Sequence, residues 1–256
     1  MNAKKLMVAA VAASAALGLY ANTYYVTPTG AGLKDGSDWD NAFGSIGDAV
    51  AACGTAAGEV RVLAGTYELA AQVSVPKWAN VTINGGYSGS GEERSESATI
   101  VKAATGVRTR LFFVDSRAKL VLDHLTLKDG CLPEGMTTAD TFGNAIFAQG
   151  DALTLTFCDV VDNGGAFSDN KTHGAAVCAA AGTLTVEDCL FRNNTVDNST
   201  PNNGNAVEGG AIRAKQCATT IRRTTFDANS VTVKNANAGG GAIHLSYAAN
   251  AVIEDC

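Results

Sequence analysis

The sequence predicts an all-β fold, a right-handed parallel β-helix in which the chain winds into a solenoid of stacked coils. Three observations favour it: a motif recurs in four copies, its strands alternate apolar and polar residues, and glycine is abundant (28 of 256 residues). Alternation is typical of half-buried strands, and copies that cannot bury an apolar face alone do so by stacking. Glycine and asparagine are poor helix formers, which disfavours helical repeats of similar length.

Residues 1–21 are expected to be a secretory signal peptide. Lys4 and Lys5 precede an apolar run from Leu6 to about Leu17, and the small residue Ala21 lies at a suitable cleavage position. The run is too short to span a membrane comfortably, and no second apolar segment of the sequence is long enough to do so. The mature chain is therefore expected to be exported.

Residues 22–57 are expected to cap the solenoid. Within them, residues 44–56 (GSIGDAVAACGTA) have the pattern of a short amphipathic helix, with Ile46, Ala49, Val50 and Cys53 on one face. Such a helix would cover the open first coil and hide its free strand edge. The β-helix itself is expected to span residues 58–256, in roughly six coils.

The repeat is clearest in GGAIRA (209–214) and GGAIHL (240–245). Its alanines are Ala145, Ala176, Ala211 and Ala242, which are 31, 35 and 31 residues apart, and a weaker copy occupies residues 111–130. We expect the paired glycines to form a tight corner before each strand, because such corners need unusual backbone angles.

Stacking predicts columns of like residues. Two inward columns are expected, Ile146, Val177, Ile212 and Ile243, and Leu127, Val160, Phe191 and Phe226. A third column contains the turn residues Asn163, Asn194 and Asn229. Asparagine tolerates left-handed backbone and can hydrogen-bond from coil to coil.

Two segments resemble known families. The GGAI motif with FRNN and FDAN resembles the Gly-Gly-Ala-Ile and Phe-x-x-Asn repeats of polymorphic outer membrane proteins. YYVTPTGAGLKDGSDWDNAFGSIGDAV (24–50), followed by VRVLAGTYEL (60–69), is similar to the opening of exported bacterial proteins with a pectate-lyase-like β-helix. The resemblance covers most of residues 24–256. It implies an extracellular or outer-membrane surface location, with either an adhesin or scaffold role or activity on polysaccharides, and fold alone does not choose between them.

The first candidate site is an outward column of Phe147, Cys178, Arg213 and His244. Arg213 beside His244 can bind a carboxylate, or serve a β-elimination in which one group abstracts a proton and the other stabilises the enolate. His173 is a third candidate catalytic residue. The alternative is an exposed strand face that carries arbitrary polar residues. This alternative is favoured because the residue type differs at each position of the column.

Two further columns alternate in charge from coil to coil. One contains Glu187, Arg222 and Glu254, and its neighbour contains Asp188, Arg223 and Asp255. A surface ion-pair ladder accounts for the alternation. The functional alternative is a calcium site with Arg222 and Arg223 as substrate clamps, but each acidic pair has basic neighbours, so no metal site is predicted. Calcium is expected as a cofactor only if the chain is a lyase.

Seven cysteines include no Cys-x-x-Cys pair, which disfavours a zinc site. Cys158, Cys189 and Cys256 share a column with Thr224. In-register side chains hold neighbouring sulfurs parallel, so a buried thiol stack is preferred to a disulfide.

His124, in VLDHLTL, aligns with Phe157 and Asp188 at a strand-to-turn position. Its Asp-His pair resembles that of some lyases. However, the Arg-x-Pro-x-x-Arg run of pectate lyases and the paired aspartates of polygalacturonases are missing.

The leading hypothesis is a non-catalytic surface scaffold or adhesin-like module that contacts an extracellular polysaccharide or a host or cell-surface protein. The rival is a polysaccharide lyase or glycoside hydrolase acting on an acidic polysaccharide. The net charge of −6 argues against nucleic acid as a partner.

The long segment TVDNSTPNNGNAVE (195–208) is expected to be a polar, flexible insertion, either beside a binding face or simply tolerated. The last copy stops at VIEDC, before its Phe-x-x-Asn turn, so the chain is expected to be a fragment of a longer protein.

Overall fold

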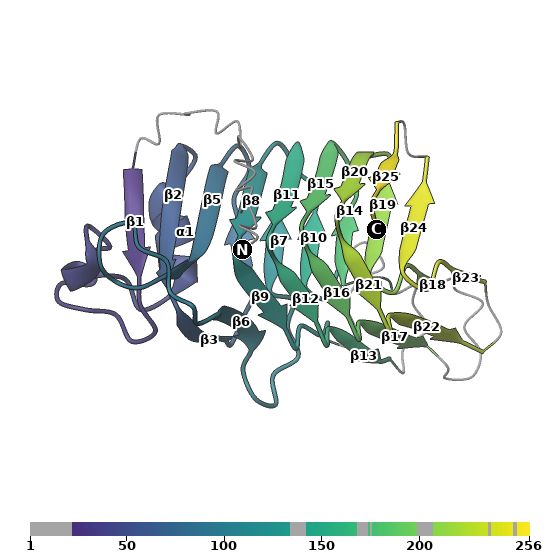
Figure 1. Cartoon of the computed structure of the whole chain (residues 1–256), viewed down its shortest axis with the longest axis horizontal. Helices are drawn as coiled ribbons and strands as arrows, with labels where there is room; N and C mark the ends of the chain where they lie inside the picture. The colour runs from purple at the N-terminus through teal and green to yellow at the C-terminus, as the bar shows by residue number, and fades with distance from the viewer. Residues whose placement is uncertain are drawn as a thin grey trace, which may run out of the picture.

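In a computed structural model, the chain forms a parallel β-helix of about six turns (Figure 1). The structure describes residues 22–133, 142–167, 174, 176–198, 207–234, 237–247 and 250–256. The expected signal peptide, residues 1–21, lies outside the described residues. Among the described helices, none is long and apolar enough to cross a membrane. The fold class predicted from the repeats is confirmed, including one short helix near the N-terminus.

Three parallel sheets build the solenoid, and each full turn contributes one strand to each of them. Sheet 1 has eight strands: β1 (Asn22–Val26), β2 (Ala57–Leu63), β5 (Asn80–Tyr87), β8 (Lys119–Asp123), β11 (Ala152–Thr156), β15 (Thr183–Glu187), β20 (Ala218–Arg222) and β25 (Val252–Glu254). Sheet 2 has six: β3 (Gly65–Leu69), β6 (Thr99–Ala103), β9 (Leu125–Lys128), β12 (Asp159–Val161), β16 (Leu190–Arg192) and β21 (Thr225–Asp227). Sheet 3 also has six: β4 (Val73–Val75), β7 (Phe112–Val114), β10 (Ile146–Ala148), β14 (Val177–Ala179), β19 (Ile212–Lys215) and β24 (Ile243–Ser246).

The inward columns are those expected from the repeat. Ile146 pairs with Val177, Val177 with Ile212, and Ile212 with Ile243. In sheet 2, Phe191 and Phe226 pair and their rings stack with centroids 5.2 Å apart. Because each coil covers the apolar face of its neighbour, most of these side chains are fully buried.

The predicted asparagine column is a hydrogen-bonded ladder at the corner after sheet 2. The Nδ2 of Asn163 donates to the Oδ1 of Asn194 over 3.0 Å, and the Nδ2 of Asn194 donates to the Oδ1 of Asn229 over 2.8 Å. The backbone part of the prediction was wrong, because the left-handed residue is the one before each asparagine, with φ of 56° at Asp162 and 54° at Asn193. The bend precedes the asparagine, whose amide can then point inward at the next coil.

The paired glycines do form a corner before two strands of sheet 3, β19 and β24. Gly209 and Gly240 have φ of 73° and 59°. Gly210 needs glycine for a different reason, because a Cβ there would collide with the carbonyl oxygen of Gly241 on the next coil, whereas a Cβ at Gly241 would make only an ordinary contact of 3.7 Å with the Asn229 carbonyl oxygen. The motif therefore reports architecture, with a glycine for the bend in both copies and one for close approach at Gly210.

The N-terminal cap contains β1, the 3₁₀ turn η1 (Trp39–Asn41) and α1 (Ile46–Cys53). The Ser45 side chain caps α1 by accepting a hydrogen bond from the backbone N–H of Asp48, 3.1 Å away. The residues expected on its apolar face are buried: Ile46, Ala49, Val50 and Cys53. The helix packs against β1, β2 and β4 and so covers the first coil as predicted.

A second layer lies outside the solenoid. It consists of a sheet formed by β13 (Gly164–Ala166), β17 (Thr195–Asn198) and β22 (Ser230–Val233), and a pair formed by β18 (Val207–Glu208) and β23 (Ala238–Gly239). Its own apolar cluster contains Leu132, Phe167, Val196 and Val207. The expectation that residues 195–208 are a polar, flexible insertion was wrong at both ends, where two valines anchor strands; residues 199–206 lie outside the described part.

Candidate functional site

The column that contains Arg213 and His244 is not an exposed face. Its register is as expected, with Cys178 beside Arg213 and Arg213 beside His244. However, Phe147, Cys178 and Arg213 are buried. Phe142 packs on the Arg213 guanidinium, with the ring centroid 4.2 Å from Cζ. The alternation of the strand correctly placed these residues outside the solenoid core, but chain segments from the turns cover them.

Arg213 and His244 converge on a carboxylate of the chain itself. Glu208 forms an ion pair with the Nε of Arg213, and its other oxygen lies 3.9 Å from the Nε2 of His244. Burial alone would lower the pKa of the Arg213 guanidinium, but the neighbouring Cys178 and Glu208 raise it on balance. The carboxylate site expected for a ligand is therefore already filled. His173 lies outside the described residues.

Arg222 and Arg223 are also engaged within the chain. Arg222 lies between Glu187 (3.6 Å) and Glu254 (2.9 Å). Arg223 donates two hydrogen bonds to Asp188, at 2.7 and 2.8 Å, and these lower the pKa of Asp188. These contacts join opposite charges on neighbouring coils, as in the ion-pair ladder expected from the alternating columns. Among the described residues, no group of three or more His, Cys, Asp or Glu side chains is arranged to hold a metal ion.

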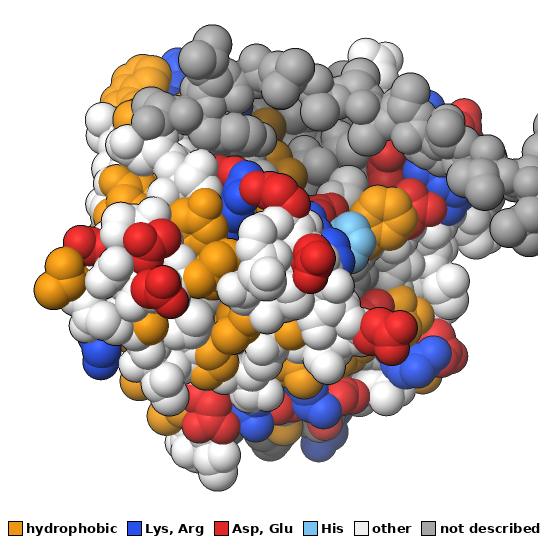
Figure 2. All heavy atoms as spheres, turned by 60° about the vertical axis from the view of Figure 1, so that its left-hand side comes forward, with side chains coloured by type: hydrophobic (Ala, Val, Ile, Leu, Met, Phe, Trp, Pro, Cys, Tyr) orange, Lys and Arg blue, Asp and Glu red, His pale blue; other side chains and the backbone are white. Residues whose placement is uncertain are grey.

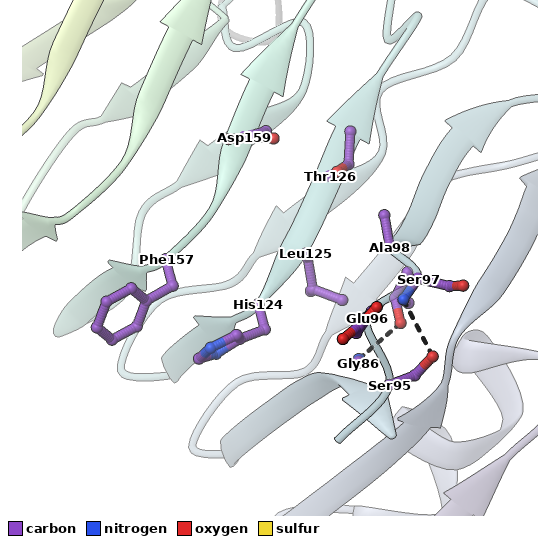
Figure 3. A pocket seen from close by; sticks show the side chains of 11 residues that line it. Gly86, Ser95, Glu96, Ser97, Ala98, His124, Leu125, Thr126, Phe157 and Asp159 are labelled. Atoms are coloured by element: carbon purple, nitrogen blue, oxygen red, sulfur yellow. Dashed lines mark hydrogen bonds between the residues drawn. The ribbon is translucent and has the colours of Figure 1, made fainter. Parts of the chain in front are cut away.

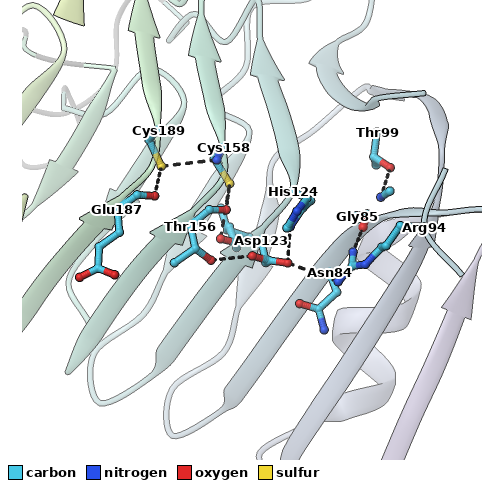
Figure 4. Close-up of polar contacts among 12 residues, drawn as sticks. Asn84, Gly85, Arg94, Thr99, Asp123, His124, Thr156, Cys158, Glu187 and Cys189 are labelled. Atoms are coloured by element: carbon cyan, nitrogen blue, oxygen red, sulfur yellow. Dashed lines mark hydrogen bonds and ion pairs between the residues drawn. The ribbon is translucent and has the colours of Figure 1, made fainter. Parts of the chain in front are cut away.

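The thiol column lies just inside these charges. Cys158 and Cys189 are buried, Cys256 is exposed, and these three side chains are thiols with no disulfide between them. The Sγ of Cys158 and of Cys189 donates to the carbonyl two residues earlier, Thr156 and Glu187 (Figure 4). Thr224 makes the same bond with its hydroxyl, 2.8 Å from the Arg222 carbonyl, which explains how threonine fits a cysteine column.

The corner after sheet 1, which we call the left-handed corner, repeats its backbone in successive coils. Its residues all have positive φ: His124 (53°), Phe157 (50°), Asp188 (53°), Arg223 (45°) and Asp255 (55°). The N–H of His124 donates to the Thr156 carbonyl of the next coil (3.1 Å), and that of Phe157 donates to the Glu187 carbonyl (3.2 Å). The alignment of His124 with Phe157 and Asp188 is thereby confirmed. Because backbone groups fix this corner, its side chains are free to differ.

A pocket of about 220 Å³ lies beside this corner, against the loop that joins β5 to β6 (Figure 3). Its lining mixes polar and apolar groups and comes from three successive coils: Gly86, Ser95, Glu96, Ser97, Ala98, Thr99, His124, Leu125, Thr126, Phe157 and Asp159. Burial raises the pKa of Asp159, although the charge of Arg192 opposes this.

Asp123 orients the histidine at the pocket. Its Oδ2 lies 2.6 Å from the Nδ1 of His124 and 3.4 Å from the Nη2 of Arg94, and its Oδ1 accepts a hydrogen bond from Thr156 over 2.7 Å (Figure 4). This contact assigns the Nδ1 proton to the side of Asp123, so the Nε2 of a neutral ring is an acceptor. The pair thus has the geometry of an oriented acceptor or base.

Phe157 is the aromatic side chain of the pocket. It is 54% exposed, and its ring lies 4.9 Å from the His124 imidazole at an interplanar angle of 35°. The two rings point the same way at one side of the pocket, with Glu96 and Ser97 across from them (Figure 3). Figure 2 shows acidic and basic side chains on the same face of the molecule.

Sequence reasoning found only part of this site. It singled out His124 and its alignment with Phe157, but it gave no role to Phe157, Glu96 or Asp159. The available signal was an aromatic residue in a column whose other members are polar. No signal indicated Glu96, because the loop between β5 and β6 belongs to no repeat.

No protein-family model, curated protein or solved structure matches the chain. The β-solenoid follows from the structure, whereas the resemblance to pectate-lyase-like proteins and to polymorphic outer membrane proteins stays a prediction from the motifs.

Proposed function

We propose that the chain is an exported, non-catalytic β-helix scaffold of the adhesin type, which contacts a carbohydrate or protein partner at a bacterial surface. The observation that carries this proposal is the Arg213–Glu208 ion pair, which occupies the arginine expected to serve catalysis. Arg222 and Arg223 are likewise bound to carboxylates of neighbouring coils. A clamp for an acidic polysaccharide needs cations whose charge is not already compensated.

Three further observations support the proposal. The sequence begins with a segment that has the pattern of a signal peptide, and its repeats resemble those of polymorphic outer membrane proteins. The solenoid presents a long surface built by stacked coils, which is the usual binding device of such folds. These observations concern the location of the chain and its binding surface, and none of them requires catalytic activity.

The test joins a binding assay to a turnover assay on residues 22–256. The labelled chain is applied to immobilised neutral and acidic polysaccharides and to fibronectin and collagen, and is separately incubated with polygalacturonate and calcium. We expect saturable binding to at least one surface and no rise in ultraviolet absorbance from unsaturated product. Binding to none of these surfaces, or steady product formation, would contradict the scaffold role.

A polysaccharide lyase or hydrolase is the second candidate, and the Asp123–His124 pair favours it. An imidazole held by a carboxylate can accept a proton through Nε2, as a β-elimination requires. If product does form in the assay above, His124→Gln should abolish it, whereas Tyr247→Ala, which replaces an exposed ring outside the pocket, should leave it unchanged.

A further inference from the structure

We propose that the pocket between the left-handed corner and the loop of Glu96 binds a neutral sugar ring, with Phe157 as the stacking surface. The inference rests on the proposed surface role and names its site and ligand.

Phe157 occupies its position at a cost. A non-glycine residue in the left-handed region loses about 1 kcal/mol relative to ordinary backbone, and an exposed aromatic ring also leaves apolar area in water. The corner does not need this side chain, since Asp188 and Arg223 hold the same backbone conformation on later coils. Trp78 and Tyr247 are also exposed and left-handed, so Phe157 differs from them in lining a pocket.

The polar groups of the lining suit hydroxyl groups. The Nε2 of His124 is oriented as an acceptor by Asp123, and the Glu96 carboxylate lies across the pocket from it (Figure 3). Thr126 and Ser97 add hydroxyls that both donate and accept. A few polar groups around an apolar surface can fix the orientation of a ring whose faces are apolar and whose edges carry hydroxyls.

The volume and the charged residues of the pocket restrict the class of ligand further. Sites for drug-sized molecules have volumes of about 300–1,000 Å³. The volume of about 220 Å³ therefore suits one ring of a longer chain that continues along the surface. Among the described residues, the pocket is lined by the acidic residues Glu96 and Asp159 and by no lysine or arginine. Uronic acids would meet like charge there, which disfavours an acidic sugar. The ligand assigned to the pocket is a neutral sugar, and a cationic amino sugar is the competing outcome of the test.

The test titrates residues 22–256 with cellohexaose, laminarihexaose and mannohexaose, with hexagalacturonate and a glucosamine hexamer as charged arms, by calorimetry and NMR. We expect at least one neutral hexamer to bind more tightly than both charged arms. Phe157→Ala should weaken that binding at least tenfold, and Glu96→Gln several-fold. Tyr247→Ala is the matched control, because Tyr247 is also aromatic, exposed (83%) and left-handed (φ 52°) but lies outside the pocket.

Three results would overturn the inference: no binding of any neutral hexamer, tighter binding of a charged arm, or neutral binding that Phe157→Ala leaves unchanged. Unfolding curves of each variant separate loss of the site from loss of the fold. Binding of a neutral sugar that does not depend on Phe157 would contradict the proposed pocket and leave the scaffold role standing. Turnover of polygalacturonate together with neutral binding that depends on Phe157 would contradict the scaffold role and leave the pocket standing.

Discussion

The corner after sheet 2 and the left-handed corner turn the same coils in different ways. At the first, Asn163, Asn194 and Asn229 repeat the side chain, and their amides bond from coil to coil in the interior. At the second, the backbone repeats with φ between 45° and 55°, whereas the side chains change from histidine to phenylalanine to aspartate to arginine. The corner after sheet 2 therefore repeats a side chain, whereas the left-handed corner repeats only a backbone conformation.

The difference follows from which atoms join the coils. When the bridging atoms belong to a side chain, almost any replacement leaves buried polar groups without partners. When they are backbone N–H and carbonyl groups, the side chain is released toward solvent. Positions where the backbone repeats and the side chain does not are therefore the places where this solenoid can carry a site.

The largest expected effect comes from breaking the ladder with Asn194→Leu. The substitution orphans the buried N–H of Asn163 (3.1 Å from the Asn194 Oδ1) and the carbonyl of Val160 (2.8 Å from Nδ2). At about 1–3 kcal/mol for each group, the free energy of unfolding should fall by about 3 kcal/mol or more. Urea unfolding followed by circular dichroism measures the loss.

Asn193→Gly is the matched control, because Asn193 is the exposed, left-handed neighbour of Asn194. Glycine keeps that conformation without strain, so stability should change by no more than about 0.5 kcal/mol. Equal losses in the two variants would show that the bend, and not the amide ladder, holds this corner together.

A small effect is expected from Phe157→Asn at the other corner. Asparagine tolerates the left-handed backbone, which relieves about 1 kcal/mol of strain, while the lost contact with the His124 ring costs a similar amount. The free energy of unfolding should stay within about 0.5 kcal/mol of the parent value in the same urea assay. A loss above about 2 kcal/mol would mean that Phe157 is structural and would remove the contrast between the corners.

The smallest effect concerns Asp188 and Arg223, which lie one and two coils beyond Phe157 at the left-handed corner. Hydrogen bonds from Arg223 lower the pKa of Asp188 in the folded chain below its ordinary value of 3.8. The pair therefore contributes stability above that value, which is lost as the pH falls through the lowered pKa. Because both side chains are partly exposed, screening by solvent should keep this contribution small.

NMR titration of the Asp188 carboxyl carbon measures this pKa directly. Arg223→Ala should raise it toward the ordinary value and flatten the loss of stability between about pH 5 and about pH 2. An unchanged Asp188 pKa in the variant would show that Arg223 is not its cause.

Much of the fold could be predicted because the solenoid repeats. Ile146, Val177 and Ile212 share one environment, so aligning the copies was equivalent to finding the contacts between coils. The cap helix was predictable because Ile46, Ala49, Val50 and Cys53 lie on one helical face. The site was harder: the alignment placed Arg213 beside His244 correctly, but it could not show that Glu208 pairs with Arg213.

The sequence by itself determined the coil, its period and its inward columns, because each depends on residues within one repeat or on the next copy of it. It also determined the cap helix, whose apolar face is local to one short segment. Only the tertiary structure decided which outward residues are accessible. Glu208 reaches Arg213 from a segment that precedes its strand, and Glu96 lines the same pocket as His124 from a loop outside every repeat. Burial and pocket shape depend on how irregular segments fold back on the regular coils, and no periodicity in the sequence records that path.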